Sequence, residues 1–272
     1  MIARPKRAIT LCFRANSVRP YNGCVLPLRD MKLTDKSKFE KSYYERLHMK
    51  TTIKNKKQKI AQAAEIVARL KERYPSAECA LEYHGEPWKL LVMGRLSAQC
   101  TDARVNIVCE ELFDRFPTLT ALADAPLEEI ENIVRPCGLY RTKAANIKDA
   151  CLMLRDEFGG VLPSDMDTLL RFPGVGRKIA NLLLGDIYHL PAIVADTHCI
   201  RICGRLGFYP ETEKDPHRVE SVMVQLVEPL EQSDFCHRIV WFGREVCMAR
   251  SPRCHDCPLA DLCAKGKKQI EI

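Results

Sequence analysis

Helical periodicity, with no competing strand pattern, is the feature that most constrains the fold of this 272-residue chain. From about residue 55 onward, apolar residues recur at helical spacing; Ile60, Ala63, Ala64, Val67 and Leu70 lie on one helix face. Similar stretches are expected at roughly 88–98, 101–114, 118–123, 126–135, 143–157, 165–171, 177–187, 196–206, 216–228 and 233–245. Breaks such as "GEP", "RPCGLY" and "FGGVLP" separate them. No segment alternates like a strand and no long repeat is present, so the sequence predicts an all-α fold.

The positive charge of the chain is concentrated in its first 50 residues. The net charge is +7, but residues 1–50 hold 12 of the 42 Lys and Arg residues and only 4 of the 35 Asp and Glu residues. Three interpretations remain open for this basic extension: a solvated tail (or a true start at Met31 or Met49), an organelle-targeting peptide, and a DNA-binding arm. Because the rest is nearly neutral, any basic surface there must be local.

Four of the 14 cysteines crowd into the C-terminal region as C-x6-C-x2-C-x5-C. They are Cys247, Cys254, Cys257 and Cys263. No secretory signal is evident and no apolar run approaches the length of a membrane span, so a metal centre in a reducing compartment fits better than a disulfide framework. The spacing alone suits either structural zinc or a [4Fe–4S] cluster.

A glycine-containing hairpin lies in the stretch "LLRFPGVGRKIANLLLG". Ser164 and Asp167 form an S-x-x-D start signal for the helix that precedes it. Gly174 and Gly176 permit a turn with positive φ, and the following helix exposes unpaired N–H groups at its N-terminus. Such groups bind anions, and a phosphate is the obvious ligand, although paired glycines also occur in tight turns for packing alone.

Lys178 and Asp196 stand at the starts of the two helices that follow the hairpin. A lysine amine attacks a sugar carbon only when it is neutral, and the neighbouring Arg177 and the positive end of the helix dipole favour the neutral form. Asp196 opens the motif "VADTH", where it caps a helix well. A solvated surface lysine and a capping aspartate are the alternatives to catalytic roles, and capping is compatible with catalysis.

The segments "LRFPGVGRKIANLLLG", "VADTH" and "MGRLSAQCTDARVN", together with the cysteine spacing, resemble the helix-hairpin-helix DNA glycosylase superfamily that includes endonuclease III. The resemblance runs from about residue 55 to the end of the sequence. It implies a two-domain fold, in which a six-helix barrel at 80–190 carries the hairpin motif at about 164–187. Residues 51–79 and 191–272 would form the cluster domain, and residues 1–50 would lie outside both.

The resemblance also implies roles for individual residues. Lys178 matches the family's Schiff-base lysine and Asp196 its catalytic aspartate, while the four cysteines would hold a [4Fe–4S] cluster. The expected DNA contacts are Gln99, which would fill the gap left by a flipped base, and Gly174, Val175, Gly176, Arg177, Arg250 and Arg253. Asp102 and His198 are pocket candidates. Arg95 and Ser251 depart from the family pattern, and the segment with Leu139 and Tyr140 resembles a second DNA-facing hairpin.

The function implied is that of a base-excision repair enzyme, a bifunctional glycosylase and abasic-site lyase that removes oxidised pyrimidines from duplex DNA. Its location would be cytoplasmic and nucleoid-associated in a bacterium, or an organelle or the nucleus in a eukaryote, and it would be a monomer. Three alternatives stay open. They are another lesion specificity (a pyrimidine dimer or a thymine mismatch), a non-catalytic DNA-binding module with an iron–sulfur centre, and a zinc-structured scaffold.

Overall fold

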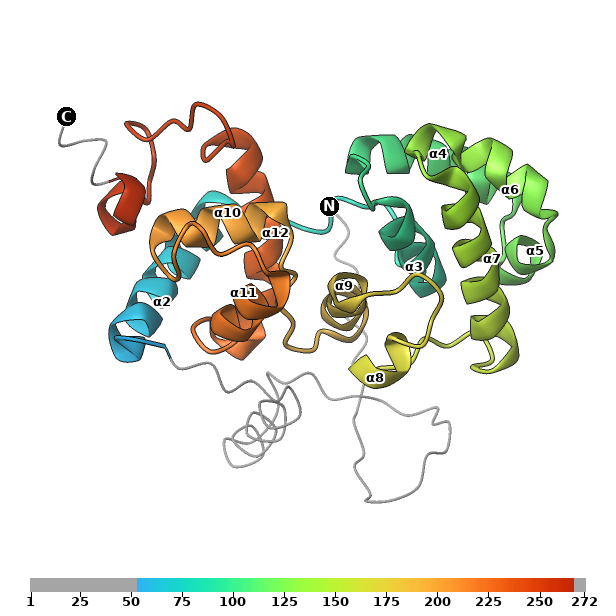
Figure 1. The fold of residues 1–272 in the computed structure, drawn as a ribbon, viewed down its shortest axis with the longest axis horizontal. Coiled ribbons are helices and arrows are strands. Elements are labelled where there is room, and N and C mark those ends of the chain that lie inside the picture. Colours follow the sequence, from blue (N-terminus) through green and yellow to red (C-terminus); the bar gives the residue numbers. More distant parts are fainter. Residues whose placement is uncertain (1–52, 267–272) are drawn as a thin grey trace, which may run out of the picture. The chain divides into compact units, whose positions relative to one another are not determined.

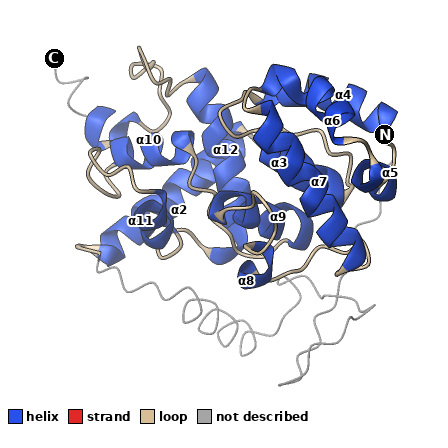
Figure 2. Cartoon of the chain, turned by 45° about the vertical axis from the view of Figure 1, so that its right-hand side comes forward, coloured by secondary structure: helices blue, strands red, loops and turns tan. Residues whose placement is uncertain are grey.

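The computed structural model describes residues 53–266, and the described chain is helical, with no strand in this range (Figures 1 and 2). This confirms the predicted all-α class. The helices are α2 (Lys56–Arg73), α3 (Pro87–Leu96), α4 (Asp102–Arg115), α5 (Leu119–Asp124), α6 (Leu127–Val134), α7 (Tyr140–Asp156), α8 (Met166–Leu169), α9 (Arg177–Tyr188), α10 (Thr197–Leu206), α11 (Pro216–Met223) and α12 (Gln232–Glu245), with short 3₁₀ turns η2 (Arg135–Cys137), η3 (Pro229–Glu231) and η4 (Ala260–Leu262). None of these helices is long and apolar enough to cross a membrane.

Side-chain caps fix where several helices begin. The Thr101 hydroxyl accepts a hydrogen bond from the backbone N–H of Arg104 at the start of α4, and Thr118 caps α5 in the same way. The start of α8 differs from the prediction, because Asp165 rather than Ser164 is the capping residue, and its carboxylate accepts from Thr168 N at 2.8 Å. The backbone of Asp165 has the extended conformation that an N-cap requires.

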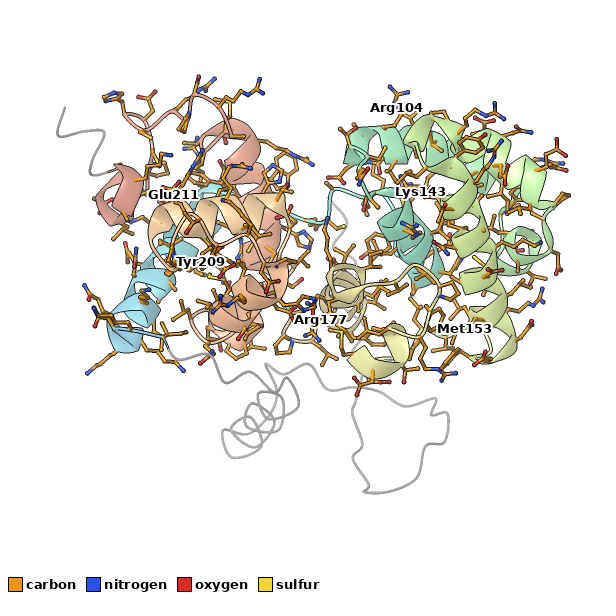
Figure 3. All side chains as sticks on the ribbon, viewed as in Figure 1. Arg104, Lys143, Met153, Arg177, Tyr209 and Glu211 are labelled. Carbon is orange, nitrogen blue, oxygen red and sulfur yellow. The ribbon has the colours of Figure 1, made fainter. Side chains whose placement is uncertain are left out.

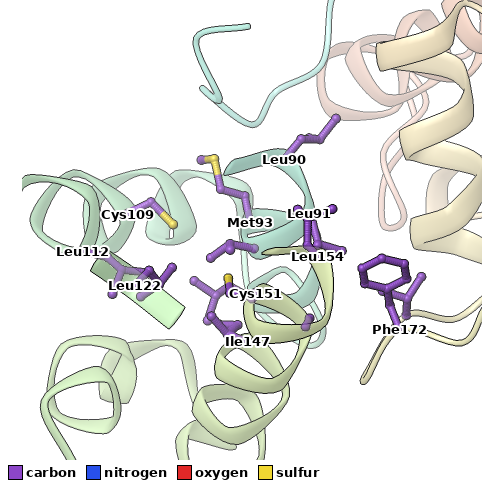
Figure 4. Close-up of a cluster of buried hydrophobic side chains, with 14 of the residues drawn as sticks. Leu90, Leu91, Met93, Cys109, Leu112, Leu122, Ile147, Cys151, Leu154 and Phe172 are labelled. Atoms are coloured by element: carbon purple, nitrogen blue, oxygen red, sulfur yellow. The ribbon is translucent and has the colours of Figure 1, made fainter. Parts of the chain in front are cut away.

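The helices from α3 to α9 share one apolar core, shown in part in Figure 4. Leu90, Leu91 and Met93 of α3 face this core, and Cys109 and Cys151 are buried in it as small apolar side chains. No cysteine in residues 53–266 is paired in a disulfide.

Helix α9 connects this core to the remaining helices. It packs against α3 and α8 on one side and against α12 on the other, while α12 also packs against α2 and α10. The loops that precede α9 and α10 therefore lie where the two groups of helices meet. The proposed domain boundaries stay a prediction, and the basic extension at 1–50 lies outside the described residues.

Candidate functional site

One cavity brings together three residues that are far apart in the sequence. It is lined by Lys178 of α9, Asp196 at the N-cap of α10, and Asp102 at the first position of α4. Its walls come from residues 78–81, from Ser97, and from the α12 residues Cys236, His237, Val240 and Trp241. The empty space amounts to about 610 Å³, its solvent-open part included. The cavity thus opens to solvent beside an amine and two carboxylates.

Lys178 occupies the second position of α9, where the helix N-terminus is positive. Lys178 is exposed, and within residues 53–266 its amine makes no hydrogen bond or ion pair. The adjacent Arg177 points elsewhere, since its guanidinium forms a two-pronged ion pair with the buried Glu220 of α11, at 2.6 and 3.0 Å. The Arg177 charge is therefore matched by Glu220, and the helix N-terminus remains the positive feature next to Lys178.

Asp196 combines a structural and an electrostatic role. Its Oδ1 atom accepts a hydrogen bond from Cys199 N at 2.7 Å, which confirms the expected helix cap, and its Oδ2 atom lies 3.2 Å from Nδ1 of His198. Burial by itself would raise the pKa of this carboxyl, but the hydrogen bonds from His198 and Cys199 and the charge of Lys178 outweigh burial and lower it. Asp196 is therefore a carboxylate at neutral pH.

The two pocket candidates differ in position. Asp102 lines the cavity, and its Oδ2 atom accepts a 2.5 Å hydrogen bond from Arg244 at the end of α12. His198 is not among the residues that line the cavity and contacts Asp196 instead. The geometry gives Asp102 direct access to a ligand and gives His198 an indirect effect through Asp196.

The hairpin between α8 and α9 has one left-handed glycine, not two. Gly174 has φ +75°, whereas Gly176 has φ −101°, so of these two glycines Gly174 alone uses the positive φ that glycine permits. Val175 turns its side chain inward and donates its N–H to Phe172 O at 3.0 Å. Gly176 is the N-cap of α9 and has open space where a Cβ would stand. The surface in front of the first turn of α9 is therefore uncovered at Gly176.

Gln99 and Leu139 are exposed residues with left-handed backbones in two neighbouring loops. Gln99, between α3 and α4, has φ +54°, and Leu139, at the N-cap of α7, has φ +49° and is 60% exposed. A left-handed conformation costs energy in a residue that has a Cβ atom, and a leucine so exposed gains little from burial. Both positions are typical of residues that are held ready for contact with a ligand.

The four C-terminal cysteines surround one apolar pocket between α10, α12 and the last loop. Cys247, Cys254, Cys257 and Cys263 all line it. Within residues 53–266, no three Cys, His, Asp or Glu side chains are placed around one point as ligands of a single metal ion. Four thiols spread around one pocket fit a multi-atom cluster better than a single zinc ion.

The arginine Arg205 of α10 supports the loop that carries this pocket. It is buried, and it donates hydrogen bonds to Cys247 Sγ at 3.3 Å, to Met248 O at 2.7 Å and to Ala249 O at 2.9 Å. Gly266 N also lies 3.3 Å from Cys263 Sγ. Donors directed at cysteine sulfur stabilise thiolates that ligate iron.

Comparison with known proteins agrees with this arrangement. Residues 92–229 match the family model described as HhH-GPD superfamily base excision DNA repair protein, and residues 247–263 match the iron–sulfur binding domain of endonuclease III. Endonuclease III of Synechocystis sp. is 42% identical over 220 residues, which cover 80% of this chain and 99% of the relative. The chain belongs to the endonuclease III family.

Two solved endonuclease III structures have the same fold. One is described as a non-covalent endonuclease III–DNA complex, with 40% identity, a TM-score of 0.72, and coverage of 78% of this chain and 99% of the other. The second is described as a trapped covalent endonuclease III–DNA intermediate, with 41% identity, the same TM-score, and coverage of 78% and 98%. The protein is accordingly a base-excision repair enzyme, a DNA glycosylase and abasic-site lyase, with a [4Fe–4S] cluster in its endonuclease III iron–sulfur domain.

The loop between the first two cluster cysteines is the local basic surface that the sequence predicts for this endonuclease III relative. Arg250 and Arg253 are exposed, and neither side chain forms a hydrogen bond or ion pair within residues 53–266. Ser251 between them has φ +51°, a left-handed conformation that sharpens the loop. Both guanidinium groups are thus available to an anionic partner.

Sequence reasoning missed two features of the site. His237 of α12 lines the cavity, and its Nε2 atom lies 2.8 Å from Oδ1 of the partly buried Asp186 of α9. Burial would lower the pKa of His237, but the hydrogen bond with Asp186 outweighs it and raises that pKa.

Arg95 neither lines the cavity nor pairs with a carboxylate within the described chain; its Nε atom donates to Asn146 at 3.0 Å and lies against the hairpin. No local sequence signal marks either contact, because each joins separate helices.

Proposed function

We propose that this enzyme removes oxidised pyrimidines from duplex DNA with Lys178 as the nucleophile and then cleaves the abasic site. The observation that carries this proposal is the position of Lys178, whose amine shares one cavity with the carboxylate of Asp196 and has no hydrogen-bond or ion-pair partner among residues 53–266. The similarity to DNA-bound endonuclease III structures supports DNA as the partner.

Each step of the reaction assigns a task to a residue of the cavity. The neutral Lys178 amine bonds to C1′ of the damaged nucleotide, while the base leaves with the glycosidic electron pair and takes up a proton. The adduct loses a proton and opens to a Schiff base, and β-elimination then breaks the 3′ C–O bond. Hydrolysis finally releases Lys178. Asp196, which is ionised, stabilises the positive charge that develops on the sugar as the base departs.

The surrounding surfaces supply the DNA contacts. The N–H groups at Gly176 and the start of α9 bind a backbone phosphate, and Arg250 and Arg253 contact further phosphates. Gln99 and Leu139 fill the space that the flipped nucleotide leaves in the duplex. The four cysteines hold the [4Fe–4S] cluster, which joins their loop into one folded unit. The enzyme acts as a monomer, and its bacterial relatives favour a cytoplasmic, nucleoid-associated location.

Borohydride trapping tests the proposal. Wild-type protein and Lys178→Gln are mixed with duplex DNA that carries one thymine glycol, and borohydride then reduces any Schiff base to a stable adduct. An adduct with the wild type only is the expected result. An adduct on a plain abasic site but not on thymine glycol would retain the lyase and reject the oxidised pyrimidine. No adduct on either DNA would reject catalysis and leave a DNA-binding module.

A further inference from the structure

The lysine Lys143 of α7 is fully buried between two loops (Figure 3). Its Nζ atom donates one hydrogen bond to Leu96 O and another to Cys137 O, each at 2.8 Å. Within residues 53–266 no carboxylate pairs with it. The amine therefore serves as a bridge between two backbone segments that lie far apart in the sequence.

Core stability alone does not account for a lysine at this position. Burial lowers the pKa of Lys143, because removal from water disfavours the charged form. A methionine would fill nearly the same volume without the cost of desolvating an amine. What the lysine adds is a pair of hydrogen bonds to two specific carbonyl groups.

Those carbonyls lie in the same turns as the two exposed, left-handed residues, a few positions before each of them. Leu96 ends α3 and begins the turn that leads to Gln99, with φ +54°. Cys137 ends η2 and is followed by Gly138, with φ +69°, and by Leu139. The backbone N–H of Lys143 also donates to Leu139 O at 3.0 Å. The Lys143 amine thus holds each loop at one point, whereas its backbone N–H makes the first helical hydrogen bond of α7, which does not depend on the side chain.

The pKa of a buried thiol in one loop is also sensitive to a thiol in the other loop. Burial and the neighbouring Cys100 thiol raise the pKa of Cys137 to about 11. Cys100 follows Gln99 directly, and Cys137 lies just before Leu139. The two loops therefore meet beside Lys143, whose amine bonds a carbonyl on each side.

We propose that Lys143 is a positioning residue that holds Gln99 and Leu139 as one rigid pair, so that both enter the duplex together when the damaged nucleotide leaves the stack. This rests on the proposed function of the site. Left-handed backbone at a residue with a Cβ persists only where the surrounding structure holds it, and two buried hydrogen bonds supply that restraint.

The test is a double-mutant cycle under single-turnover conditions with the full chain. The variants are Lys143→Met, the pair Gln99→Ala plus Leu139→Ala, and the triple combination. Each is measured on a thymine glycol in duplex DNA and on an abasic site in single-stranded DNA, where no base pair has to be opened. Lys148→Met is the matched control, because Lys148 also lies on α7 and its amine also bridges two carbonyls, Ala123 O at 3.0 Å and Ala125 O at 2.6 Å.

We expect Lys143→Met to slow excision from duplex DNA by about tenfold or more, as the loss of two buried hydrogen bonds implies. Cleavage of the single-stranded abasic site should change less than about twofold, since the loops are not used there. In the background without Gln99 and Leu139, Lys143→Met should have little further effect, because the residues act as one unit. Lys148→Met should resemble the wild type on both DNAs.

Three results would overturn the proposal. The first is duplex excision by Lys143→Met at the wild-type rate. The second is an additive loss in the triple variant, which would show that Lys143 acts independently of the two loops. The third is failure of both Lys143→Met and the second variant, Lys143→Gln, to fold, which would make the lysine a requirement of the core. A wild type that is inactive on both DNAs would instead reject the proposed function.

Discussion

Arg95 of α3 lies directly behind Gly174 in the hairpin. A Cβ atom placed on Gly174 would come within 2.4 Å of Arg95 Nε and within 2.8 Å of Asn146 Oδ1, the atom to which that Nε donates. The contact joins α3, α7 and the hairpin through side chains that are partly buried. Gly174 is therefore required both by its left-handed backbone and by the close approach of a neighbouring helix.

The change Gly174→Ala should destabilise the protein more than its backbone conformation alone explains. A left-handed residue with a Cβ costs about 1–2 kcal/mol, and displacement of Arg95 adds to that. Gly159→Ala is the matched control, because Gly159 has φ +59° but nothing within 4 Å of an added Cβ. Denaturant unfolding of both variants gives the comparison. Equal losses of unfolding free energy would contradict a supporting role for Arg95.

The change Gly176→Ala should leave the stability of the protein nearly unchanged and weaken its binding to DNA. Gly176 has an ordinary backbone and open space at the Cβ position, so the free energy of unfolding should change by less than about 1 kcal/mol. The added methyl group would occupy the surface in front of the α9 N–H groups, where the phosphate is proposed to bind. Binding to an abasic duplex, measured by fluorescence anisotropy, should weaken. Wild-type affinity would argue against a phosphate at this site.

Gly174 and Gly176 show that the sequence predicts some features of the structure and not others. The helical periodicity and the turn residues predicted the ends of most helices to within a few residues, because local propensity and capping decide where a helix begins and ends. The exception is the stretch at 216–228, where α11 stops at Met223. There the Gln232 amide donates to Val224 O and Val227 O, a contact from another helix that satisfies carbonyls outside the helix.

Side-chain contacts between helices could not be predicted from the sequence, because they too depend on residues of another helix. The resemblance indicated Arg177 as a DNA contact, but its guanidinium is held by Glu220, which lies on a different helix. His237 and Arg95 are likewise positioned by tertiary contacts with Asp186 and Asn146. Motif spacing identified the chemical groups of the site, whereas packing decided which of them face the cavity.

Two substitutions of Asp196 should distinguish its role as a helix cap from the role of its negative charge in catalysis. Asp196→Asn keeps an acceptor for Cys199 N, so its effect on stability should stay below about 1 kcal/mol, whereas Asp196→Ala loses the cap as well. Both variants should lose glycosylase activity by about 100-fold or more, since the negative charge is gone. Single-turnover excision and thermal unfolding provide the two measurements. Excision by Asp196→Asn at the wild-type rate would reject the electrostatic role.

The lowered pKa of Asp196 also predicts how stability depends on pH. The carboxylate contributes its full stabilisation above the ordinary pKa of 3.8, which applies to the unfolded chain, and loses it as pH falls through the lower folded-state value. The stability advantage of the wild type over Asp196→Asn should thus be constant at higher pH and shrink only below that value. Urea unfolding across the acid range tests this. An advantage that already declines near neutral pH would contradict an ionised Asp196.

Removal of Arg205 should loosen the cluster loop. Arg205→Met leaves the carbonyls of Met248 and Ala249 without their buried donor, at a cost of about 1–3 kcal/mol. The bound cluster should then be lost faster to an iron chelator, followed by its visible absorbance. Arg69→Met is the control, because Arg69 also donates to a carbonyl of the same segment, Pro258 O, but from a partly exposed position. Equal rates of cluster loss in the two variants would reject a special role for Arg205.

The exposed pair Arg250 and Arg253 should govern the salt dependence of DNA binding. Each phosphate that a side chain neutralises releases counterions, so the double change Arg250→Ala plus Arg253→Ala should reduce the slope of log K against log salt by about 1.8. Affinity should fall similarly for damaged and undamaged duplexes, because phosphates carry no sequence or lesion information. Arg171→Ala, which removes an exposed arginine paired with Glu157, is the control. An unchanged slope in the double variant would show that this loop does not contact phosphates, and the Ser251 turn would then serve the cluster alone.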